Sequence, residues 1–377
     1  MKLYHVGFIG FGRRAEYLWE GVLKPLGSCC LTAIADPAVE AIQKKHPELD
    51  ECHYYTTAEE MLEKEPLDGV VIGTGCYLHT KYACLAAKYD LPIFLEKPIS
   101  IDREQLSELE ALLPQHNHKT VVSFPLRVTE IVTKVKELLD SGCIGEIAQV
   151  QSVNNVYYGR CYYHGWYRND ALTGGLFVTK ATHDLDYLAM LVGKGSPKWV
   201  CAMESKMVFK GDKPAGLLCK DCPEAATCPE SIQNIPADDP QTYGSYCCFA
   251  TDTGNHDSAT AIFQYENGLH VVYTQNFISR KSAGKRGARF IGFKGTLEFD
   301  FNTNTIVLTD HFSDEIKTFK LSKRKGHGGG DFLLGQNFVD VMAKRAPSVS
   351  TLENAIMGTK LCFAARESAE THRFIEL

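Results

Sequence analysis

The sequence lacks the features of a membrane or nucleic-acid-binding protein. No apolar run approaches the roughly 20 residues of a membrane-spanning helix. The 46 acidic residues outnumber the 40 basic ones, giving a net charge of −6, and this balance argues against a nucleic acid or a membrane surface as partner. The first predicted strand starts within a few residues of Met1, which leaves no room for a secretory signal. We therefore expect a cytoplasmic protein.

Cysteine, by contrast, is abundant. The chain has 377 residues, of which 44% are apolar and 14 are cysteines. This length and apolar content predict two domains with well-filled cores. Several cysteines lie in apolar segments, where buried and reduced thiols are the usual state: Cys29, Cys30, Cys84 and Cys362.

A glycine-rich turn at the start of the chain predicts a nucleotide site. The apolar run Leu3–Ile9 has strand length and leads into Gly10-Phe11-Gly12-Arg13-Arg14-Ala15, the G-x-G-x-x-G/A pattern of a dinucleotide fold. Gly10 permits the tight turn, and Gly12 lets a pyrophosphate approach the backbone. The following helix, expected over 13–23, would present its N-terminus to that anion. An ordinary turn is the alternative.

An acidic residue at the expected spacing supports this prediction. The second strand, 31–35, ends at Asp36, about 20 residues beyond the loop, where a carboxylate accepts hydrogen bonds from the adenosine ribose. A carboxylate there also repels a 2′-phosphate, which favours NAD over NADP. Arg13 and Arg14 keep NADP open, because either side chain can reach a phosphate. Alternatively, Asp36 is only a turn residue before Pro37.

The chain then alternates helix and strand, as a parallel sheet requires. Further strands are expected at 52–55, 69–73, 92–95 and 120–124. Thr74 and His79 follow one of these strands and Glu96-Lys97-Pro98 follows the next, at the carboxyl edge where open α/β sheets bind ligands. We predict an N-terminal Rossmann domain, a doubly wound parallel sheet, over residues 1–124.

These motifs carry a resemblance to a known family. The glycine loop, Ala35-Asp36-Pro37, His79 and above all Leu95-Glu96-Lys97-Pro98 resemble the Gfo/Idh/MocA family of NAD(P)-dependent oxidoreductases. The resemblance implies that Lys97 is catalytic, beside the nicotinamide, and that Pro98 positions it. It also implies a set of cofactor-binding residues: Gly10, Phe11, Gly12, Arg13, Arg14, Asp36, Thr74, His79, Glu96 and Lys97.

The chemistry of Lys97 can also be argued from its expected place. A partly desolvated lysine beside a cationic nicotinamide should have a lowered pKa, which makes it a usable proton donor or acceptor. The alternative is a solvated lysine in a turn.

The second domain is expected over residues 125–377, as an α+β domain with a large, mainly antiparallel open sheet. Its first helix is predicted at 128–139, and its last helices at 331–343 and 352–370. Strands are predicted at 146–158, 199–207, 259–265, 269–277, 288–293, 296–301, 305–309 and 315–321. An open sheet face predicts a homo-oligomer, a dimer or a tetramer.

The segment from Gly174 to Asp186 is similar to the family's second motif, a glycine turn that opens a helix bearing the catalytic histidine. The resemblance assigns His183 as the general base that removes a hydroxyl proton. The position four residues earlier is Thr179 in place of the usual aspartate, and Lys180, a further catalytic candidate, follows it. Asp184 or Asp186 would orient the histidine. A buried, structurally satisfied helix histidine is the alternative.

Substrate contacts are expected from polar and aromatic residues near this motif. Aromatic faces beside arginine suit the faces and hydroxyls of a sugar, and the equally weighted alternative is that these aromatics form core. The Gly-rich segment 325–331 either approaches the substrate or is a linker into a helix. Our candidate substrate-binding residues are Arg127, Trp166, Arg168 and Asp184.

A polar insertion, about 211–248, carries a cysteine pattern. Cys219, Cys222 and Cys228 have the close spacing of a tetrahedral zinc site, with Cys247 or Cys248 as fourth ligand and Cys248 preferred. A structural metal would explain how a segment with little apolar content holds a shape. Iron–sulfur ligation and free or disulfide-bonded thiols are the alternatives.

Together these features predict an NAD-dependent oxidoreductase that acts on a secondary hydroxyl of a sugar, cyclitol or sugar derivative, with structural zinc. An NAD-dependent glycosidase that uses transient oxidation is a second hypothesis. A non-catalytic protein that senses NAD is a third.

Overall fold

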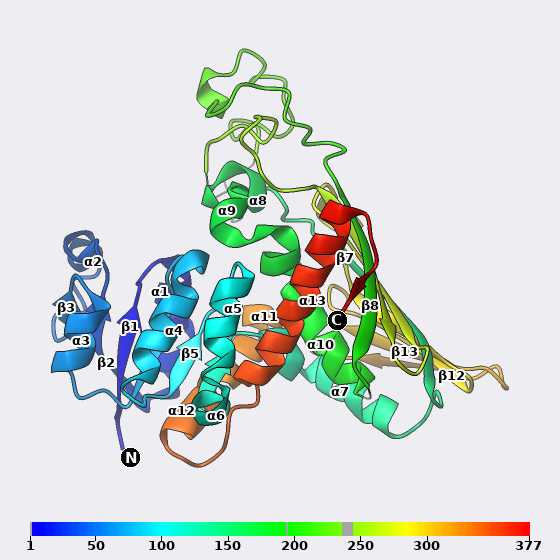
Figure 1. Ribbon diagram of the computed structural model, residues 1–377, viewed down its shortest axis with the longest axis horizontal. Helices are drawn as coiled ribbons and strands as arrows, with labels where there is room; N and C mark the ends of the chain where they lie inside the picture. The colour runs from blue at the N-terminus through cyan, green and yellow to red at the C-terminus, as the bar shows by residue number, and fades with distance from the viewer. Residues whose placement is uncertain (1, 194, 236–243) are drawn as a thin grey trace. The chain divides into compact units, whose positions relative to one another are not determined.

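The computed structural model describes residues 2–193, 195–235 and 244–377 (Figure 1). Met1 and the 236–243 part of the predicted insertion lie outside the described residues. The chain divides into two compact units. The first contains residues 1–133, 182–190 and 324–360, and the second contains 134–181, 191–323 and 361–377. The segments 182–190 and 324–360 thus fold with the nucleotide-binding unit, although the sequence analysis placed them in the second domain.

A six-stranded parallel sheet forms the centre of the first unit, with the order β3-β2-β1-β4-β5-β6. All six predicted strands are present, and the predicted Rossmann sheet is confirmed. The central strands are buried along almost their whole length, as expected when helices cover both faces. The strands are β1 (Tyr4–Ile9), β2 (Cys29–Ala35), β3 (His53–Tyr55), β4 (Gly69–Ile72), β5 (Ile93–Leu95) and β6 (Thr120–Val122).

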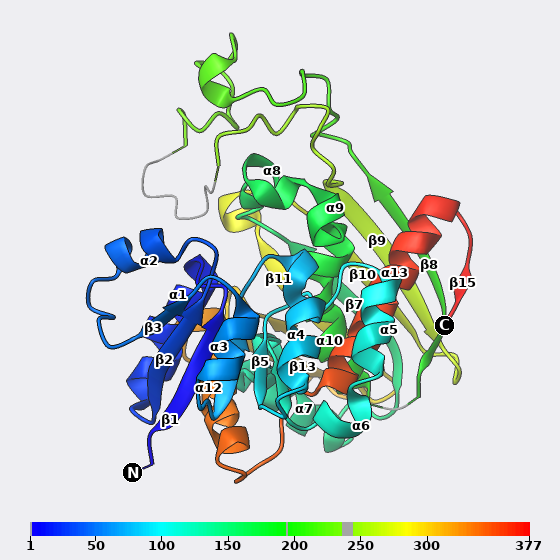
Figure 2. The same ribbon diagram turned by 60° about the vertical axis from the view of Figure 1, so that its left-hand side comes forward.

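Helices flank this sheet, and α3 is drawn beside its strands in Figure 2. Local signals explain two of their starts: Thr57 caps α3 by accepting from the Glu60 N–H at 3.4 Å, and Asp102 caps α5 by accepting from the Gln105 N–H at 2.8 Å. The α-helices of this unit are α1 (Arg13–Leu18), α2 (Val39–Lys45), α3 (Ala58–Lys64), α4 (His79–Ala87), α5 (Arg103–Glu110), α6 (Leu113–His116), α11 (Lys325–Gly328) and α12 (Gly330–Met342).

The helix expected over 13–23 changes character along its length. It is α-helical only to Leu18, continues as a π-helix (η1, Trp19–Leu23) and ends in a 3₁₀ turn (η2, Lys24–Leu26). The later helix α12 packs on the same core: the Phe338 ring meets Phe94 edge-on at 5.7 Å, and Leu334 is fully buried. A late segment of the chain thereby completes the hydrophobic core of the first unit.

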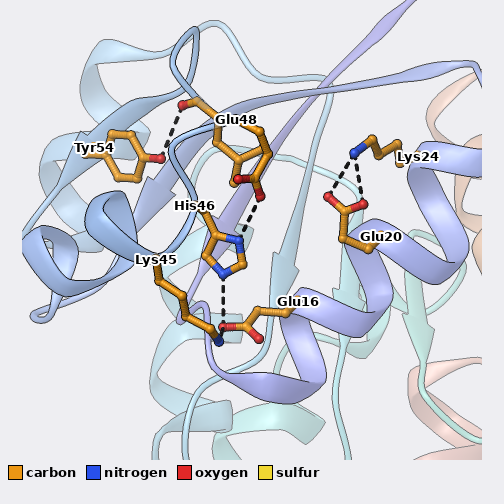
Figure 3. Close-up of polar contacts among 8 residues, drawn as sticks. Glu16, Glu20, Lys24, Lys45, His46, Glu48 and Tyr54 are labelled. Carbon is orange, nitrogen blue, oxygen red and sulfur yellow. Dashed lines mark hydrogen bonds and ion pairs between the residues drawn. The ribbon is translucent and has the colours of Figure 1, made fainter.

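Polar contacts fasten α2 to α1 beside the glycine loop (Figure 3). Glu16 of α1 pairs with Lys45, and the His46 Nε2 lies 3.3 Å from the same carboxylate. The other ring nitrogen of His46 lies 3.0 Å from Glu48. The ring also meets Phe11 of the loop edge-on at 5.8 Å. These contacts hold the C-terminal end of α2 against α1 and the glycine loop.

A nine-stranded sheet forms the second unit, with the order β14-β13-β12-β11-β7-β10-β9-β8-β15. Neighbouring strands run antiparallel except for the parallel pair β7 and β10, so the predicted mainly antiparallel sheet is confirmed. The strands are β7 (Ile147–Asn155), β8 (Pro197–Ser205), β9 (Ser258–Tyr265), β10 (His270–Asn276), β11 (Lys285–Gly292), β12 (Gly295–Asp300), β13 (Thr305–Asp310), β14 (Ile316–Lys320) and β15 (Ile375–Glu376).

Short helices follow β7, where the sequence analysis named no helix. They are α8 (Cys161–His164) and α9 (Asp170–Thr173). Aromatic residues of this region enter a buried cluster with Phe209 and Phe277, which supports the interpretation of these aromatics as core. Three longer helices contain residues of both units: α7 (Glu130–Asp140), α10 (Thr182–Val192) and α13 (Leu352–Thr371). Among the described residues, no helix combines the length and apolar character needed to cross a membrane.

Candidate active site

The glycine loop has the backbone geometry that the sequence motif demands. Gly10 adopts a φ of +78°, and a Cβ at this position would lie 2.9 Å from the backbone of Thr74. A Cβ at Gly12, in contrast, would meet nothing within 4 Å. The loop therefore needs glycine at the first position for its turn, and at the second it leaves its backbone open to an approaching ligand, which fits a pyrophosphate.

Asp36 follows β2 and is tied to this loop. Its carboxylate accepts from the Phe11 N–H at 3.0 Å and from the Ala38 N–H at 2.8 Å. Each carboxylate oxygen can accept a second hydrogen bond, so ribose hydroxyls fit beside these contacts. The turn interpretation and the cofactor interpretation of Asp36 are thus compatible.

Arg14 is bound by carboxylates of its own unit. Its Nε donates to Glu96 at 2.8 Å, and its second terminal nitrogen donates to Asp331 at 2.7 Å. The same nitrogen lies 3.2 Å from the Ser123 hydroxyl. Although burial alone would lower it, these two carboxylates hold the pKa of Arg14 above its ordinary value. Arg14 and Glu96, which we predicted to contact the cofactor, bind each other in this network, and Glu96 stands in the turn immediately before Lys97 and Pro98.

His79 supports the same turn. Its Nδ1 lies 2.6 Å from the Pro98 carbonyl and its Nε2 lies 3.0 Å from the Thr74 carbonyl. The ring is buried, and desolvation lowers its pKa. The peptide bond between Lys97 and Pro98 is cis. Both ring nitrogens thus face backbone carbonyls of the two turns that follow β4 and β5, so the His79 ring links these two turns.

Lys97 itself lies half-buried directly after β5. In the parallel sheet β5 neighbours β4, which precedes the Thr74 turn, and β4 neighbours β1, which leads into the glycine loop. Lys97 therefore stands at the carboxyl edge that carries the loop, as the sequence predicts.

His183 belongs to the same unit, near the start of α10. Its ring is buried, lies edge-on to Phe124 at 5.9 Å and is tilted toward His327 at the same centroid distance of 5.9 Å. The Nδ1 of His327 lies 2.8 Å from Asp331, the carboxylate that also binds Arg14. A series of contacts therefore links the Glu96 turn to His183. It runs through Arg14, Asp331 and His327.

Asp331 is the centre of this chain of contacts. Burial alone would raise its pKa, but hydrogen bonds and charges from His327 and Arg14 hold the pKa well below the ordinary range. A carboxylate kept ionised beside an imidazole can orient the ring and stabilise its protonated form. The sequence analysis did not name the His327–Asp331 pair. The spacing of a histidine and an aspartate four residues apart was the available signal.

Arg127 and Asp186 form a buried ion pair, 2.9 Å between the Arg127 terminal nitrogen and Oδ1. Desolvation raises the pKa of Asp186 to about 6, against the attraction of Arg127. The pair ties the η4 turn (Pro125–Val128) to α10. Arg127, a predicted substrate-binding residue, is thus paired with a carboxylate of its own unit. Asp184 is fully buried in the same helix.

Lys180 and Thr179 lie in the second unit, in a π-helix (η6, Phe177–Ala181). π-Helical hydrogen bonds join residues five apart, whereas His183, four residues beyond Thr179, lies in the α-helix α10. Lys180 is buried, donates to the Tyr158 hydroxyl and lies 4.4 Å from the centre of that ring. Thr179 donates to the Gly175 carbonyl at 2.8 Å.

Arg168 is also engaged internally. It is buried and makes two hydrogen bonds to Asp252, at 3.0 and 2.7 Å, and one to Thr253 at 2.8 Å. A bidentate carboxylate thus binds the guanidinium of Arg168, which we predicted to contact the substrate. Trp166 is exposed and stacks on Tyr167 at 4.2 Å.

The cysteines of the polar segment gather around one small cavity in the second unit. Cys219, Cys222, Cys228, Cys247 and Cys248 all line it, and so does His164. Among the described residues, one group brings three possible metal ligands within 4.8 Å of one another, and it consists of His164, Glu230 and Cys248. The predicted cysteines therefore line one cavity together with His164, which the sequence analysis did not name, but among the described residues no three of their thiols lie within 4.8 Å of one another.

Comparison with known proteins agrees with this architecture. The model of the oxidoreductase family's NAD-binding Rossmann fold matches residues 4–124, and the GFO/IDH/MocA C-terminal domain model matches residues 132–298. YteT of Bacillus subtilis, classed among oxidoreductases, is 26% identical over 347 residues, covering 80% of this chain and 79% of its own. The myo-inositol 2-dehydrogenase of Thermotoga maritima is 23% identical over 194 residues, covering 50% of this chain and 55% of its own.

Solved structures show the same fold. The myo-inositol 2-dehydrogenase of Lactobacillus plantarum aligns with a TM-score of 0.74 at 17% identity, covering 100% of both chains. The scyllo-inositol dehydrogenase of Lactobacillus casei, solved with NAD(H) and scyllo-inositol, aligns with a TM-score of 0.73 at 18% identity, covering 100% of this chain and 99% of its own. From its two matching domain models and the relatives that share them, the chain belongs to the Gfo/Idh/MocA family of NAD-dependent oxidoreductases.

Proposed function

We propose that this protein oxidises a secondary hydroxyl of a cyclitol, a sugar or a sugar derivative and reduces the corresponding ketone in reverse. One observation carries the proposal. A single compact unit holds the open glycine loop, Lys97 at the carboxyl edge, and His183 beside the His327–Asp331 pair. The named inositol dehydrogenases among the relatives support a polyol substrate.

The bound dinucleotide supplies the hydride acceptor. His183 takes the proton of the substrate hydroxyl, and the neighbouring His327 is held beside it by the ionised Asp331 carboxylate. Lys97 donates a hydrogen bond to the reacting oxygen and stabilises the negative charge that develops there. Glu96, Arg14 and His79 hold the Lys97 turn, so its ammonium group needs little reorganisation when substrate binds.

We propose NAD as the preferred cofactor, because the Asp36 carboxylate stands where a 2′-phosphate would meet its negative charge. We propose Arg13 and Arg14 of the glycine loop as candidates for contacts with a cofactor phosphate. Lys180, Trp166 and Asp184 remain our candidate catalytic and substrate-binding groups beyond Lys97 and His183.

A reaction without net oxidation is the second candidate, as in the glycosidase hypothesis. Thr179 stands where the family's dehydrogenases carry an aspartate. In addition, the 2,7-anhydro-N-acetylneuraminate hydratase of Mediterraneibacter gnavus is 24% identical over 212 residues, covering 56% of this chain and 55% of its own. Hydration transfers no net hydride, so this relative favours testing anhydro-sugars and glycosides beside polyols.

We further propose a cytoplasmic homo-oligomer, a dimer or tetramer. In β9 the side chains alternate strictly between buried and exposed, and Ile262 on the exposed side and Met203 on β8 present apolar surface. Such a face suits a second copy of the chain. Light scattering of the purified protein tests this, and a monomer would contradict it.

The deciding experiment measures NADH formation with NAD⁺ against cyclitols, sugars and sugar acids, with Lys97→Ala in parallel. We expect one substrate class to turn over, and Lys97→Ala to lower kcat/KM by about 10²–10⁴-fold while NADH still binds. Lys88→Ala, at an exposed lysine in the same unit, is the matched control. Turnover of glycosides or anhydro-sugars without net NADH formation would select the second candidate, and full activity of Lys97→Ala would refute the role of Lys97.

A further inference from the structure

The cysteine-lined cavity has the size and composition of a metal site. It encloses about 10 Å³, close to the space of one water-sized sphere. Its lining includes five thiols and one imidazole. A cavity this small suits a single ion and is too small for a cluster of several iron and sulfide ions, and a mixture of thiolates with imidazole is a ligand set that zinc prefers.

His164 is held in the orientation of a metal ligand. It is completely buried at the end of α8, and its Nδ1 lies 2.6 Å from the Tyr246 carbonyl. Because a carbonyl only accepts, Nδ1 carries the hydrogen, and the lone pair is on Nε2. No hydrogen-bond partner of Nε2 occurs among the described residues. Zinc-bound histidines typically show this arrangement, with one nitrogen on a backbone carbonyl and the other on the metal.

Cys248 belongs to a group of possible ligands that includes His164. Its Sγ, a ring nitrogen of His164 and a carboxylate oxygen of Glu230 all lie within 4.8 Å of one another. Glu230, however, already accepts from Arg160 and Arg280, each at 3.0 Å. Its two oxygens are thus occupied by arginines. His164 and Cys248 are therefore the better pair of ligands, and the arginines offset negative charge from thiolates.

We propose that this cavity binds one zinc ion, with His164 Nε2 and Cys248 Sγ as two ligands and two thiolates of the Cys219–Cys228 segment completing a tetrahedral site. This differs from the four-cysteine set expected from sequence, because the imidazole replaces one thiolate. The ion links His164 of α8 to the cysteines of the polar segment. In that segment Cys219 begins the 3₁₀ turn η7 (Cys219–Asp221). Its role is structural, since protein ligands fill all four positions.

The test uses the full chain, expressed with zinc, and measures zinc per chain by elemental analysis together with the visible spectrum after cobalt substitution. We expect about one equivalent of zinc in the wild type and loss of most of it in His164→Ala and Cys248→Ser. His164→Cys should retain about one equivalent and shift the cobalt charge-transfer bands, because a thiolate replaces a nitrogen. His256→Ala, at a half-exposed histidine of the same unit, is the matched control and should keep the zinc.

Three outcomes would overturn the proposal. The first is a wild-type chain that binds no zinc at this cavity. The second is His164→Ala with wild-type zinc content and an unchanged cobalt spectrum, which would leave a site made of cysteines alone. The third is equal zinc loss in His164→Cys and His164→Ala although both are folded by circular dichroism, since this would show that position 164 supplies no ligand atom.

Discussion

The edge of the parallel sheet and the cysteine-lined cavity hold their polar groups in different ways. At the sheet edge, protein partners occupy the charged groups around Lys97: Glu96 and Asp331 share Arg14, and His327 shares Asp331. At the cavity, thiols and the Nε2 of His164 face a space of about 10 Å³. The first arrangement pairs its charged groups with one another, whereas the second has donor atoms that an ion would bring together.

This difference teaches how each region should respond to mutation. Groups at the sheet edge support one another, so a change there should alter catalysis or cofactor choice while the fold persists. Groups at the cavity depend on the ion, so a change there should alter metal content and local stability. Four mutations, ordered from the largest expected effect to the smallest, test the expectation for the nucleotide-binding unit. The zinc experiment tests the expectation for the cavity.

The largest effect is expected at His183. Replacement by alanine removes the proposed base, and kcat/KM should fall by about 10²–10⁴-fold with the Kd for NADH little changed. Stopped-flow assays and fluorescence titration with NADH provide the two numbers, with His256→Ala as control. A variant that keeps wild-type kcat/KM would reduce His183 to a buried structural histidine.

The next effect concerns cofactor choice at Asp36. Asp36→Ser removes the charge that opposes a 2′-phosphate, and it also weakens the contact with the Phe11 N–H. The ratio of the NADPH Kd to the NADH Kd should therefore fall by roughly 10–100-fold, the range for losing one charged contact. Equilibrium titration with both cofactors measures the ratio. An unchanged ratio would show that Asp36 acts only as a turn residue.

A smaller effect is expected from Arg14→Lys, because one ammonium group cannot reproduce the forked contact with Glu96 and Asp331. We expect kcat to fall about tenfold, as positioning weakens, with the Kd for NADH nearly constant. Arg13→Ala serves as the comparison, since Arg13 is also a candidate for a phosphate contact and its loss should weaken NADH binding. Weaker NADH binding in Arg14→Lys, with kcat preserved, would restore Arg14 as the phosphate ligand.

The smallest effect is a pH dependence of stability. Burial raises the pKa of Asp186 from 3.8 to about 6, so the folded state holds this proton more tightly than the unfolded state does. The resulting stabilisation is full below pH 4 and is lost as pH rises to 6. In the wild type, this proton should make the free energy of unfolding fall between pH 4 and 7 by on the order of 1 kcal/mol per unit of pKa shift. Asp186→Asn should remove this contribution to the fall.

Urea denaturation at several pH values measures that slope. Asp314→Asn, at an exposed carboxylate, should leave the slope unchanged. If the wild type and Asp186→Asn show equal slopes, Asp186 is ionised in the folded state throughout this range, and its ion pair with Arg127 outweighs desolvation.

Local sequence was sufficient for the fold of both sheets. The strands of the first unit are short apolar runs bounded by turn residues, and the pattern of alternating strands and helices leaves a parallel sheet as the favoured arrangement. In the second unit, strands joined by hairpins indicated an antiparallel sheet. Helix termini were equally readable where a capping side chain was present, as at Thr57. What sequence did not reveal was the π-helix at 177–181, because i to i+5 bonding has no simple residue signature.

The sequence by itself also determined which motif would stand at the carboxyl edge of the sheet, since Gly10 and Asp36 each follow a strand directly and Lys97 is the second residue after one. Only the tertiary structure decided how the neighbouring charges are used. Arg14, Arg127 and Arg168 were expected to contact ligands, yet each binds a carboxylate that is distant in sequence. Likewise, His164 joined the cysteines although 55 residues separate it from Cys219. The reason is physical: a buried charge or lone pair must find a partner wherever the fold brings one close, and sequence spacing does not encode that distance.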